Sequence, residues 1–222
     1  MIRINQFVAK STGVSRRNAD ELVETGRVKV NGVKAKIGQS IESGDQVTLD
    51  GKRLAQKEVT TIIFNKPVGY VCSRKKQGDD PTIYELLPQD YDHLNPVGRL
   101  DKDSSGLMIL SNDGDLVYSL SHPSTGKWKQ YYIETHRELS DAQIKKLDAG
   151  VNLEDGISKL KTSPKENGYI VEMQEGRNRQ IRRTVEAIGA KVTKLQRLSI
   201  GEIELNNLPE GKWQKIAEAS VK

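Results

Sequence analysis

The sequence has little of what disulfides, metal sites and membrane spans require. Cys72 is its only cysteine, so no internal disulfide can form. Three scattered histidines accompany it, and their positions do not favour a zinc site. No apolar run approaches the roughly 18 residues of a membrane-spanning helix. The first residues, MIRINQFVAKSTGVSRR, lack the apolar core of a signal peptide. We therefore expect a cytoplasmic protein with no membrane partner.

Aromatic residues are also scarce, at 5% of the 222 residues. Hydrophobic residues make up 35% and charged residues 29%, which is typical of a folded, water-soluble chain. The net charge of +5 is unevenly distributed. Residues 1–54 hold ten lysines and arginines against six acidic residues, whereas residues 55–222 hold 25 against 24. This concentration of positive charge favours an acidic polymer as partner of the N-terminal quarter.

Residues 1–54 are predicted to form a small module of two helices and a sheet. Apolar spacing predicts helices over 3–10 and 15–25, with Ser15 as the N-cap of the second. The stretch RVKVNGVKA alternates around Asn31-Gly32, which indicates a tight β-hairpin, and DQVTLDGKRL supplies another strand.

Basic side chains gather on the expected outer face of this module. A solvated surface and a phosphate-binding face, where each neutralised cation releases a counterion, are both compatible with their spacing. The residues concerned are Lys10, Arg16, Arg17, Arg27 and Lys29. The stretch RINQFVAKSTGVSRRNADELVETGRVKVNG resembles the S4-like RNA-binding domain, named after a small-subunit ribosomal protein. That resemblance implies that these residues bind structured RNA, mainly through its backbone and shape.

A polar linker, 55–61, is expected to join this module to a second domain, 62–222. There, IIFNKPVGYVCS predicts a strand entering a tight loop, and DPTIYELLP predicts a short helix capped near Asp80. Strands are expected at QYYIETH and GYIVEMQ, and helices over 140–148 and 178–188. Because helices and strands do not alternate strictly, we predict an α+β fold with a mixed, mostly antiparallel sheet.

Asp101 lies between Arg99 and Lys102, just before the apolar run Leu107–Leu110. Nearby cations favour the charged form of a carboxylate, so Asp101 could accept a proton, attack an electrophilic carbon, or simply pair with an arginine. The small residues that follow it would let a ligand approach, and a buried strand would hold the loop rigidly. Asp103 is close in sequence, but its side chain is expected to point away from that of Asp101.

The stretch EGRNRQIRRTVEAIG predicts a glycine turn followed by a helix, with Ile181 on the inward face. Arg182 borders that face, while Arg177, Arg179 and Arg183 are expected to project more freely. A basic surface helix is one interpretation. The other gives Arg182 an acidic partner, with Asp101 as the natural candidate, and leaves the remaining arginines for phosphates.

The strand GKWKQYYIET places Tyr131 and Tyr132 on opposite faces. One is expected in the core. The other could face a cleft beside Asp101 and stack on an unpaired nucleobase.

Four motifs resemble those of the ribosomal RNA pseudouridine synthases that carry an N-terminal S4-like domain. They are NKPVGYVCS, GRLDKDSSGLMILSNDGDL, KQYY and EGRNRQIRR, in that order along the chain. The resemblance extends over essentially the whole sequence. It implies isomerisation of a specific uridine to pseudouridine, without cofactor or metal, in a second domain with the pseudouridine synthase fold.

The resemblance also implies roles for single residues. Asp101 would be the catalytic aspartate, acting on the ribose through a covalent adduct or an eliminated sugar while uracil turns and rejoins through C5. Arg182 would pair with it, and Tyr131 would stack on the target base, with Tyr132 as the alternative if the register differs by one. The residues expected to bind substrate are Arg99, Ile181, Lys66 and Arg179.

The substrate is the less determined part of this prediction. EGRNRQIRR and KQYY favour large-subunit (23S) RNA, whereas GYVCS and the compact length favour small-subunit (16S) RNA; we favour the former. A ribosomal assembly intermediate is a possible partner, and a monomer is expected. The competing hypothesis is a non-catalytic RNA-binding or ribosome-assembly factor that retains the fold, although such a factor does not need Asp101, Tyr131 and Arg182 together.

Overall fold

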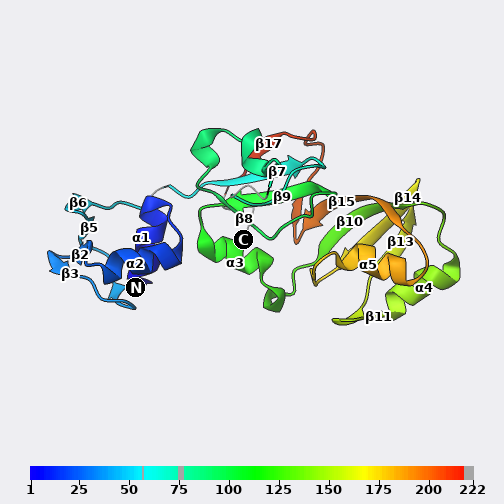
Figure 1. The fold of residues 1–222 in the computed structure, drawn as a ribbon, viewed down its shortest axis with the longest axis horizontal. Helices are drawn as coiled ribbons and strands as arrows, with labels where there is room; N and C mark the ends of the chain where they lie inside the picture. The colour runs from blue at the N-terminus through cyan, green and yellow to red at the C-terminus, as the bar shows by residue number, and fades with distance from the viewer. Residues whose placement is uncertain (57, 75–77, 218–222) are drawn as a thin grey trace. The chain divides into compact units, whose positions relative to one another are not determined.

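The structure is a computed structural model that describes residues 1–56, 58–74 and 78–217. The chain forms two compact units, Met1–Thr60 and Thr61–Lys222, coloured blue to cyan and cyan to red in Figure 1. The predicted linker, 55–61, falls at this division, and its Lys57 lies outside the described residues. The predicted second domain, 62–222, includes residues 75–77 and 218–222, which also lie outside the described residues.

The first unit contains short helices and strands that agree with the sequence pattern. These are β1 (Ile2–Arg3), α1 (Ile4–Thr12), α2 (Arg16–Glu24), β2 (Val28–Val30), β3 (Val33–Lys34), β4 (Ser40–Ile41), β5 (Val47–Leu49) and β6 (Lys52–Arg53). The Ser15 hydroxyl caps α2 by accepting a hydrogen bond from the Asn18 N–H, as predicted. Asn31 and Gly32 take positive φ angles of 49° and 82°, which a tight hairpin between β2 and β3 requires.

The second unit is built around one large sheet. Its strands are β7 (Thr61–Lys66), β8 (Asn95–Pro96), β9 (Ser105–Ser111), β10 (Lys129–Thr135), β11 (Val151–Leu153), β12 (Gly156–Ser158), β13 (Lys161–Lys165), β14 (Gly168–Met173), β15 (Val192–Ile200), β16 (Ile203–Glu204) and β17 (Trp213–Lys215). Its α-helices are α3 (Gly114–Ser121), α4 (Asp141–Ala149) and α5 (Gln180–Ala187), and its 3₁₀ helices are η1 (Ile83–Leu86), η2 (Gln89–Tyr91) and η3 (Pro123–Thr125).

Within the described residues, the order of the main sheet is β13-β14-β10-β15-β9-β7-β17, with β16 added to β15 and β8 to β9. The strands β15 and β9 pair in parallel, and the other neighbours in this sheet pair in antiparallel fashion. The predicted α+β class with a mostly antiparallel sheet is confirmed. One short helix differs in detail, because the capping box of η1 is formed by Thr82 and Glu85 rather than near Asp80.

The central strand β9 is buried along its whole length, so its side chains enter two different cores. Met108 and Leu110 belong to a larger cluster that includes residues of α4 and α5. Leu107 and Ile109 belong to a second cluster that includes Leu120 of α3. The two clusters place helices on both faces of the sheet, and the loop that precedes β9 is anchored on a rigid base.

The parallel pairing of β9 and β15 depends on Gly106. It joins only two residue pairs, Ser105 with Gln196 and Gly106 with Arg197. Gly106 has a φ of 103°, and a Cβ atom there would lie 2.3 Å from the Arg197 carbonyl oxygen. No side chain fits in that space, so glycine lets the two backbones meet directly in front of the Asp101 loop.

No helix among the described residues is long and apolar enough to cross a membrane.

Candidate active site

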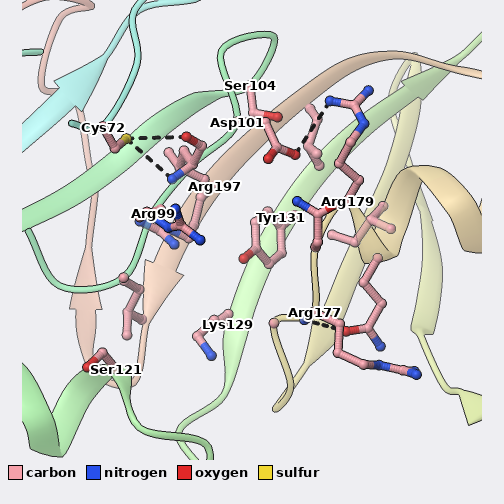
Figure 2. Close-up of a pocket in the computed structure, with 18 of the residues that line it drawn as sticks. Cys72, Arg99, Asp101, Ser104, Ser121, Lys129, Tyr131, Arg177, Arg179 and Arg197 are labelled. Atoms are coloured by element: carbon pink, nitrogen blue, oxygen red, sulfur yellow. Dashed lines mark hydrogen bonds and ion pairs between the residues drawn. The ribbon is translucent and has the colours of Figure 1, made fainter. Parts of the chain in front are cut away.

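A cavity of about 820 Å³ opens beside the parallel pairing of β9 and β15, within the second unit. Its volume falls in the range of pockets that hold small molecules. It is lined by the loop before β9, by β10 and β15, and by the turn that leads into α5. Figure 2 shows Asp101 and Tyr131 among the side chains around this space.

Asp101 begins a tight turn, in which the Ser104 N–H donates to the Asp101 carbonyl at 3.1 Å. The small residues after Asp101, Ser104 to Gly106, were expected to form a loop. Ser105 and Gly106 instead belong to β9, so the loop is shorter than expected. The Asp101 carboxylate remains 31% exposed and lies 3.7 Å from the Arg179 Nη1 atom. This ion pair is drawn as a dashed line in Figure 2.

The pairing of Asp101 with Arg182 stays a prediction, because the observed bonds of Arg182 run to neighbours of Asp101. Arg182 binds Asp103, two residues further along the same turn. Its Nη2 donates to the Asp103 carbonyl at 2.6 Å, and its Nε lies 3.3 Å from the Asp103 carboxylate. A further bond, at 3.2 Å, runs to the carbonyl of Val192 at the start of β15. Arg182 therefore connects the Asp101 turn to the neighbouring strand, and Arg179 forms an ion pair with the Asp101 carboxylate.

Asp103 also lies closer to Asp101 in space than expected, since one guanidinium contacts both carboxylates. The Arg179 Nη1 and Nη2 donate to the two Asp103 oxygens at 3.0 and 2.9 Å. Hydrogen bonds from Arg179 hold the pKa of the Asp103 carboxyl below its ordinary value, because they favour the ionised form. Asp103 thus fixes the guanidinium that Asp101 faces.

The assignment of Lys66 to substrate binding is not supported. Its side chain is 0% exposed at the end of β7. The ammonium donates to three carbonyl oxygens: Pro67 at 3.0 Å, Asp101 at 3.1 Å and Ser104 at 2.7 Å. Burial lowers the pKa of this amine, since a desolvated charge is disfavoured. Lys66 thus has an acceptor for each of its three N–H groups, and two of the acceptors belong to the Asp101 turn.

The two tyrosines of β10 are separated by the pleat of the strand. Tyr131 lines the cavity and is 7% exposed. Tyr132 lies on the other face, where its hydroxyl donates to the Glu166 carbonyl at 3.2 Å and its ring stacks under Lys194. Of the two, Tyr131 is the ring that a ligand in the cavity would meet, and the role of base platform remains a prediction.

Other predicted residues fall into two groups. Arg99 and Ile181 line the cavity, as expected for residues that meet substrate. The free projection of Arg177 and Arg183 is wrong, because both bind Asp155: Arg177 Nη1 at 2.9 Å and Arg183 Nη2 at 2.7 Å. These arginines fix the turn before α5 against the β11–β12 hairpin.

Sequence reasoning missed three residues that line the same cavity: Cys72, Lys129 and Arg197. The Cys72 thiol donates to the Leu100 carbonyl and accepts from the Leu100 N–H, and burial raises its pKa. Lys129 precedes Tyr131 by two positions, so strand periodicity could have placed both on one face. Arg197 lies on β15, a strand that the sequence analysis did not predict.

In the first unit, the five predicted RNA-binding side chains have different surroundings. Arg16 and Arg17 are exposed at the start of α2, Lys29 is exposed on β2, and Lys10 is half-buried in the last turn of α1. Arg27 forms a two-point ion pair with Asp50, through bonds of 3.0 and 2.5 Å. Part of its charge is thus already neutralised.

Two known protein families match this chain. A family model described as RNA pseudouridylate synthase matches residues 60–187, and an S4 domain model matches residues 2–53. The chain belongs to the RNA pseudouridylate synthase family. The predicted enzyme class, an RNA pseudouridine synthase with an N-terminal S4 domain, is confirmed.

Similar members of this pseudouridylate synthase family span nearly all of the chain. The dual-specificity RNA pseudouridine synthase RluF of Salmonella typhi is 34% identical over 97% of this chain and 76% of its own length. The ribosomal large subunit pseudouridine synthase B of Yersinia pestis is also 34% identical, over 96% of this chain and 72% of its own length. A crystal structure of a pseudouridylate synthase, 27% identical, superposes with a TM-score of 0.70 and covers 100% of this chain and 98% of its own.

The cavity of this pseudouridylate synthase is lined by charged side chains and by apolar ones such as Leu100 and Ile181. Among the residues that the structure describes, no group of three or more histidine, cysteine, aspartate or glutamate side chains could hold a metal ion. The partly exposed Asp101 carboxylate and Tyr131 belong to the same lining.

Proposed function

We propose that this RNA pseudouridine synthase isomerises a specific uridine of ribosomal RNA, with large-subunit RNA as the favoured substrate. The names of the relatives support this choice, because one is a large-subunit enzyme and another has dual specificity. The four cavity-lining motifs and the S4 domain support an RNA substrate in which the target nucleotide leaves its stack.

One observation carries the proposed mechanism: the Asp101 carboxylate and the Tyr131 ring line the same cavity. In this proposal, uracil lies against Tyr131, and Asp101 acts on the ribose as nucleophile at C1′ or as base at C2′. The N-glycosidic bond breaks and the uracil turns. C5 then bonds to C1′, while the Asp101–C1′ bond of the nucleophilic route breaks or the proton taken from C2′ in the base route is returned. C5 releases its proton, and the freed N1 takes up one. Arg179 and Arg182 act by fixing the Asp101 turn, and Arg99 helps to hold the displaced nucleotide.

We further propose a monomer that acts in the cytoplasm, where it meets ribosomal RNA either free or in an assembly intermediate. The S4 domain supports this arrangement, since contacts remote from the reacting bond can offset the cost of unstacking a base, which is a few kcal/mol.

The decisive experiment measures tritium release from ribosomal RNA labelled at uridine C5, with large- and small-subunit RNAs tested separately. We expect the wild type to release tritium, and Asp101→Asn to lose about 10³-fold or more of the rate while binding RNA normally. Asp90→Asn removes a carboxylate at an exposed position outside the cavity lining and is the matched control.

Equal rates for wild type and Asp101→Asn would exclude Asp101 as the reactive group. No release from free RNA directs the same assay to assembly intermediates. If the wild type binds those particles but still releases no tritium, the non-catalytic RNA-binding factor becomes the better description.

A further inference from the structure

The cavity carries more positive charge than its own carboxylates neutralise. Its lining contains six lysine and arginine side chains but three carboxylates. Each carboxylate is paired with a different cation, and the pairs are Asp80 with Lys102, Asp101 with Arg179, and Glu175 with Arg177. Three cations are left over: Arg99, Lys129 and Arg197.

None of these three cations forms an ion pair with a carboxylate in the described part of the chain. Arg197 is 2% exposed, and its Nε donates to the Leu107 carbonyl at 2.8 Å. Its Nη2 lies 3.3 Å from the Met108 sulfur. The Lys129 ammonium donates to two carbonyl oxygens of the turn before α5, each at 3.3 Å. Arg197 is the buried member of the three, whereas Lys129 is half-buried and Arg99 is exposed, so the missing counter-ion is most unfavourable at Arg197, whose charge is desolvated.

Strand register places two of these cations beside Tyr131. Lys129 and Tyr131 are two positions apart on β10 and therefore share a face. Arg197 is the direct partner of Tyr131 across the β10–β15 pairing, and opposed residues of antiparallel strands project to the same side. The pKa of the Lys129 amine is lowered, first by burial and then by the nearby Arg197 charge, which agrees with this arrangement.

We propose that Lys129 and Arg197, together with Arg99, form a phosphate-binding subsite for the RNA backbone at the nucleotide whose base lies on Tyr131. The inference rests on the proposed function, since it takes Tyr131 as the base platform. A phosphodiester supplies the missing negative charge and several acceptor oxygens, which suit a guanidinium and an ammonium held side by side. Three cations around one ring would then bind the nucleotide at both its base and its backbone.

Binding of small nucleotides tests the subsite without requiring turnover. Calorimetric titrations of the full chain would compare uridine, uridine 5′-monophosphate and uridine 3′-monophosphate. We expect the wild type to bind at least one monophosphate about tenfold more tightly than uridine, in line with a charge-assisted contact of roughly 1.4 kcal/mol. The two monophosphates distinguish which side of the nucleotide the cations face.

Variants of Lys129 identify the source of the preference. Lys129→Gln should lose most of the phosphate preference, and Lys129→Arg, which keeps the charge, should retain most of it. Lys127→Gln is the matched control, because Lys127 is exposed two positions earlier and does not line the cavity. Arg197 is left unchanged in this test, since its bond to the Leu107 carbonyl also supports the fold.

Equal affinity of the wild type for uridine and both monophosphates, or no detectable binding of either monophosphate, overturns the subsite. So does a phosphate preference that survives in Lys129→Gln. The proposed activity is tested separately, so it is still supported after any of these outcomes if the wild type releases tritium from RNA. Conversely, a phosphate preference that depends on Lys129, in a protein that releases no tritium, supports the subsite and counts against the activity.

Discussion

At the scale of single residues, Asp101 is held by two cations that act in different ways. Lys66 binds backbone oxygens beneath the turn, and Arg179 faces the carboxylate itself. The first fixes where the carboxylate is, and the second sets the charge around it. Such separate contacts to backbone and side chain are what a preorganised catalytic group requires.

Replacement of Lys66 by methionine should therefore weaken both the fold and the activity. Lys66→Met removes the ammonium donor from three carbonyl oxygens, of which the Asp101 carbonyl keeps its bond from the Ser104 N–H, and it also removes a buried charge. We expect the free energy of unfolding to fall by about 2–4 kcal/mol and kcat to fall more than RNA affinity. Urea unfolding and tritium release would measure these effects.

The control for this substitution is Lys165→Met, which changes the same side chain at an exposed position on β13. A stable Lys66→Met protein with normal kcat would show that the ammonium does not position the turn. Loss of RNA affinity without loss of kcat would restore Lys66 to the substrate-binding group.

The sequence located the residues of this site better than their pairings. Asp101, Tyr131 and Arg179 line one cavity, but the helix pattern does not predict the ion pair of Asp101 with Arg179. The reason is that α5 begins one residue after Arg179, which adopts a left-handed φ of 47°. Helical spacing does not extend through such a residue, so the direction of its side chain could not be predicted from periodicity.

At the scale of elements, the Asp101 turn depends on neighbours that come from distant parts of the sequence. The loop before β9 is held by β7 through Lys66, by α5 through Arg179 and Arg182, and by β15 through Gly106. Residues 66 and 197 are far apart in sequence, so this support forms only when the whole sheet assembles.

Gly106→Ala should disrupt the parallel pairing of β9 and β15. The new methyl group would meet the Arg197 backbone at 2.3 Å and would also require a φ of 103°. We expect a loss of stability of at least about 3 kcal/mol, combining overpacking with backbone strain, detected by thermal and urea unfolding.

Gly211→Ala separates these two contributions. Gly211 has a φ of 77° but no atom within 4 Å of its added Cβ, so it tests strain without the clash. We expect its cost to be about 1 kcal/mol. Similar costs for the two variants would show that β9 and β15 can move apart and that their close approach is dispensable.

The contact between the loop and α5 predicts a pH dependence. Because Arg179 lowers the pKa of Asp103 in the folded protein, the unfolded chain takes up the proton first as pH falls. The stabilising effect of Asp103 should be complete above its unfolded pKa of about 3.9 and should disappear as pH falls through its lower folded value.

This dependence can be measured by comparing urea unfolding of wild type and Asp103→Asn at pH 6 and at successively lower pH values. The stability difference should be largest at pH 6 and should shrink below about pH 4. Because the Asp103 side chain is 46% exposed, the difference will be modest. A difference that grows with acidity would contradict the assigned ion pair.

Elements were predicted unevenly. The hairpin at Asn31-Gly32, the capped helices α2 and α4, and β10 follow from local signals and formed where expected. The strand β15 was missed because its buried positions do not alternate strictly, a consequence of the register shifts in its pairing with β10. With that strand, Arg197 and its place beside Tyr131 were missed as well.

At the scale of the whole molecule, the two units differ in charge and in whether they contain the cavity. The first unit has most of the excess positive charge, and the second has the cavity. This division agrees with the S4 and pseudouridylate synthase matches. Composition and motif order could predict it, whereas the identity of the target uridine depends on RNA tertiary structure that no local pattern of the protein encodes.

Loss of charge from the first unit should weaken RNA binding without changing the chemical step. The double variant Arg16→Ala and Arg17→Ala should lower affinity and reduce the slope of log affinity against log salt by up to about two. Arg27→Ala should change the slope less, because Arg27 is already paired with Asp50. Filter binding over a salt series would measure the affinity and its slope, and tritium release at saturating RNA would measure the chemical step. An unchanged slope would mean that α2 presents only a solvated surface.

The short pairing of β9 with β15 also bears on how such an enzyme diversifies. The carboxylate and its lysine belong to the β7–β9 side of that pairing, whereas the aromatic ring and its two cations belong to the β10–β15 side. Within the described residues, the backbone pairing of β9 with β15 consists of two residue pairs, and a few arginine bonds, such as that of Arg197 to the Leu107 carbonyl, add to it. Under the proposed function, substitutions that adapt the ring and Lys129 to a new RNA can therefore accumulate on β10 while the backbone contacts that hold the Asp101 turn stay unchanged.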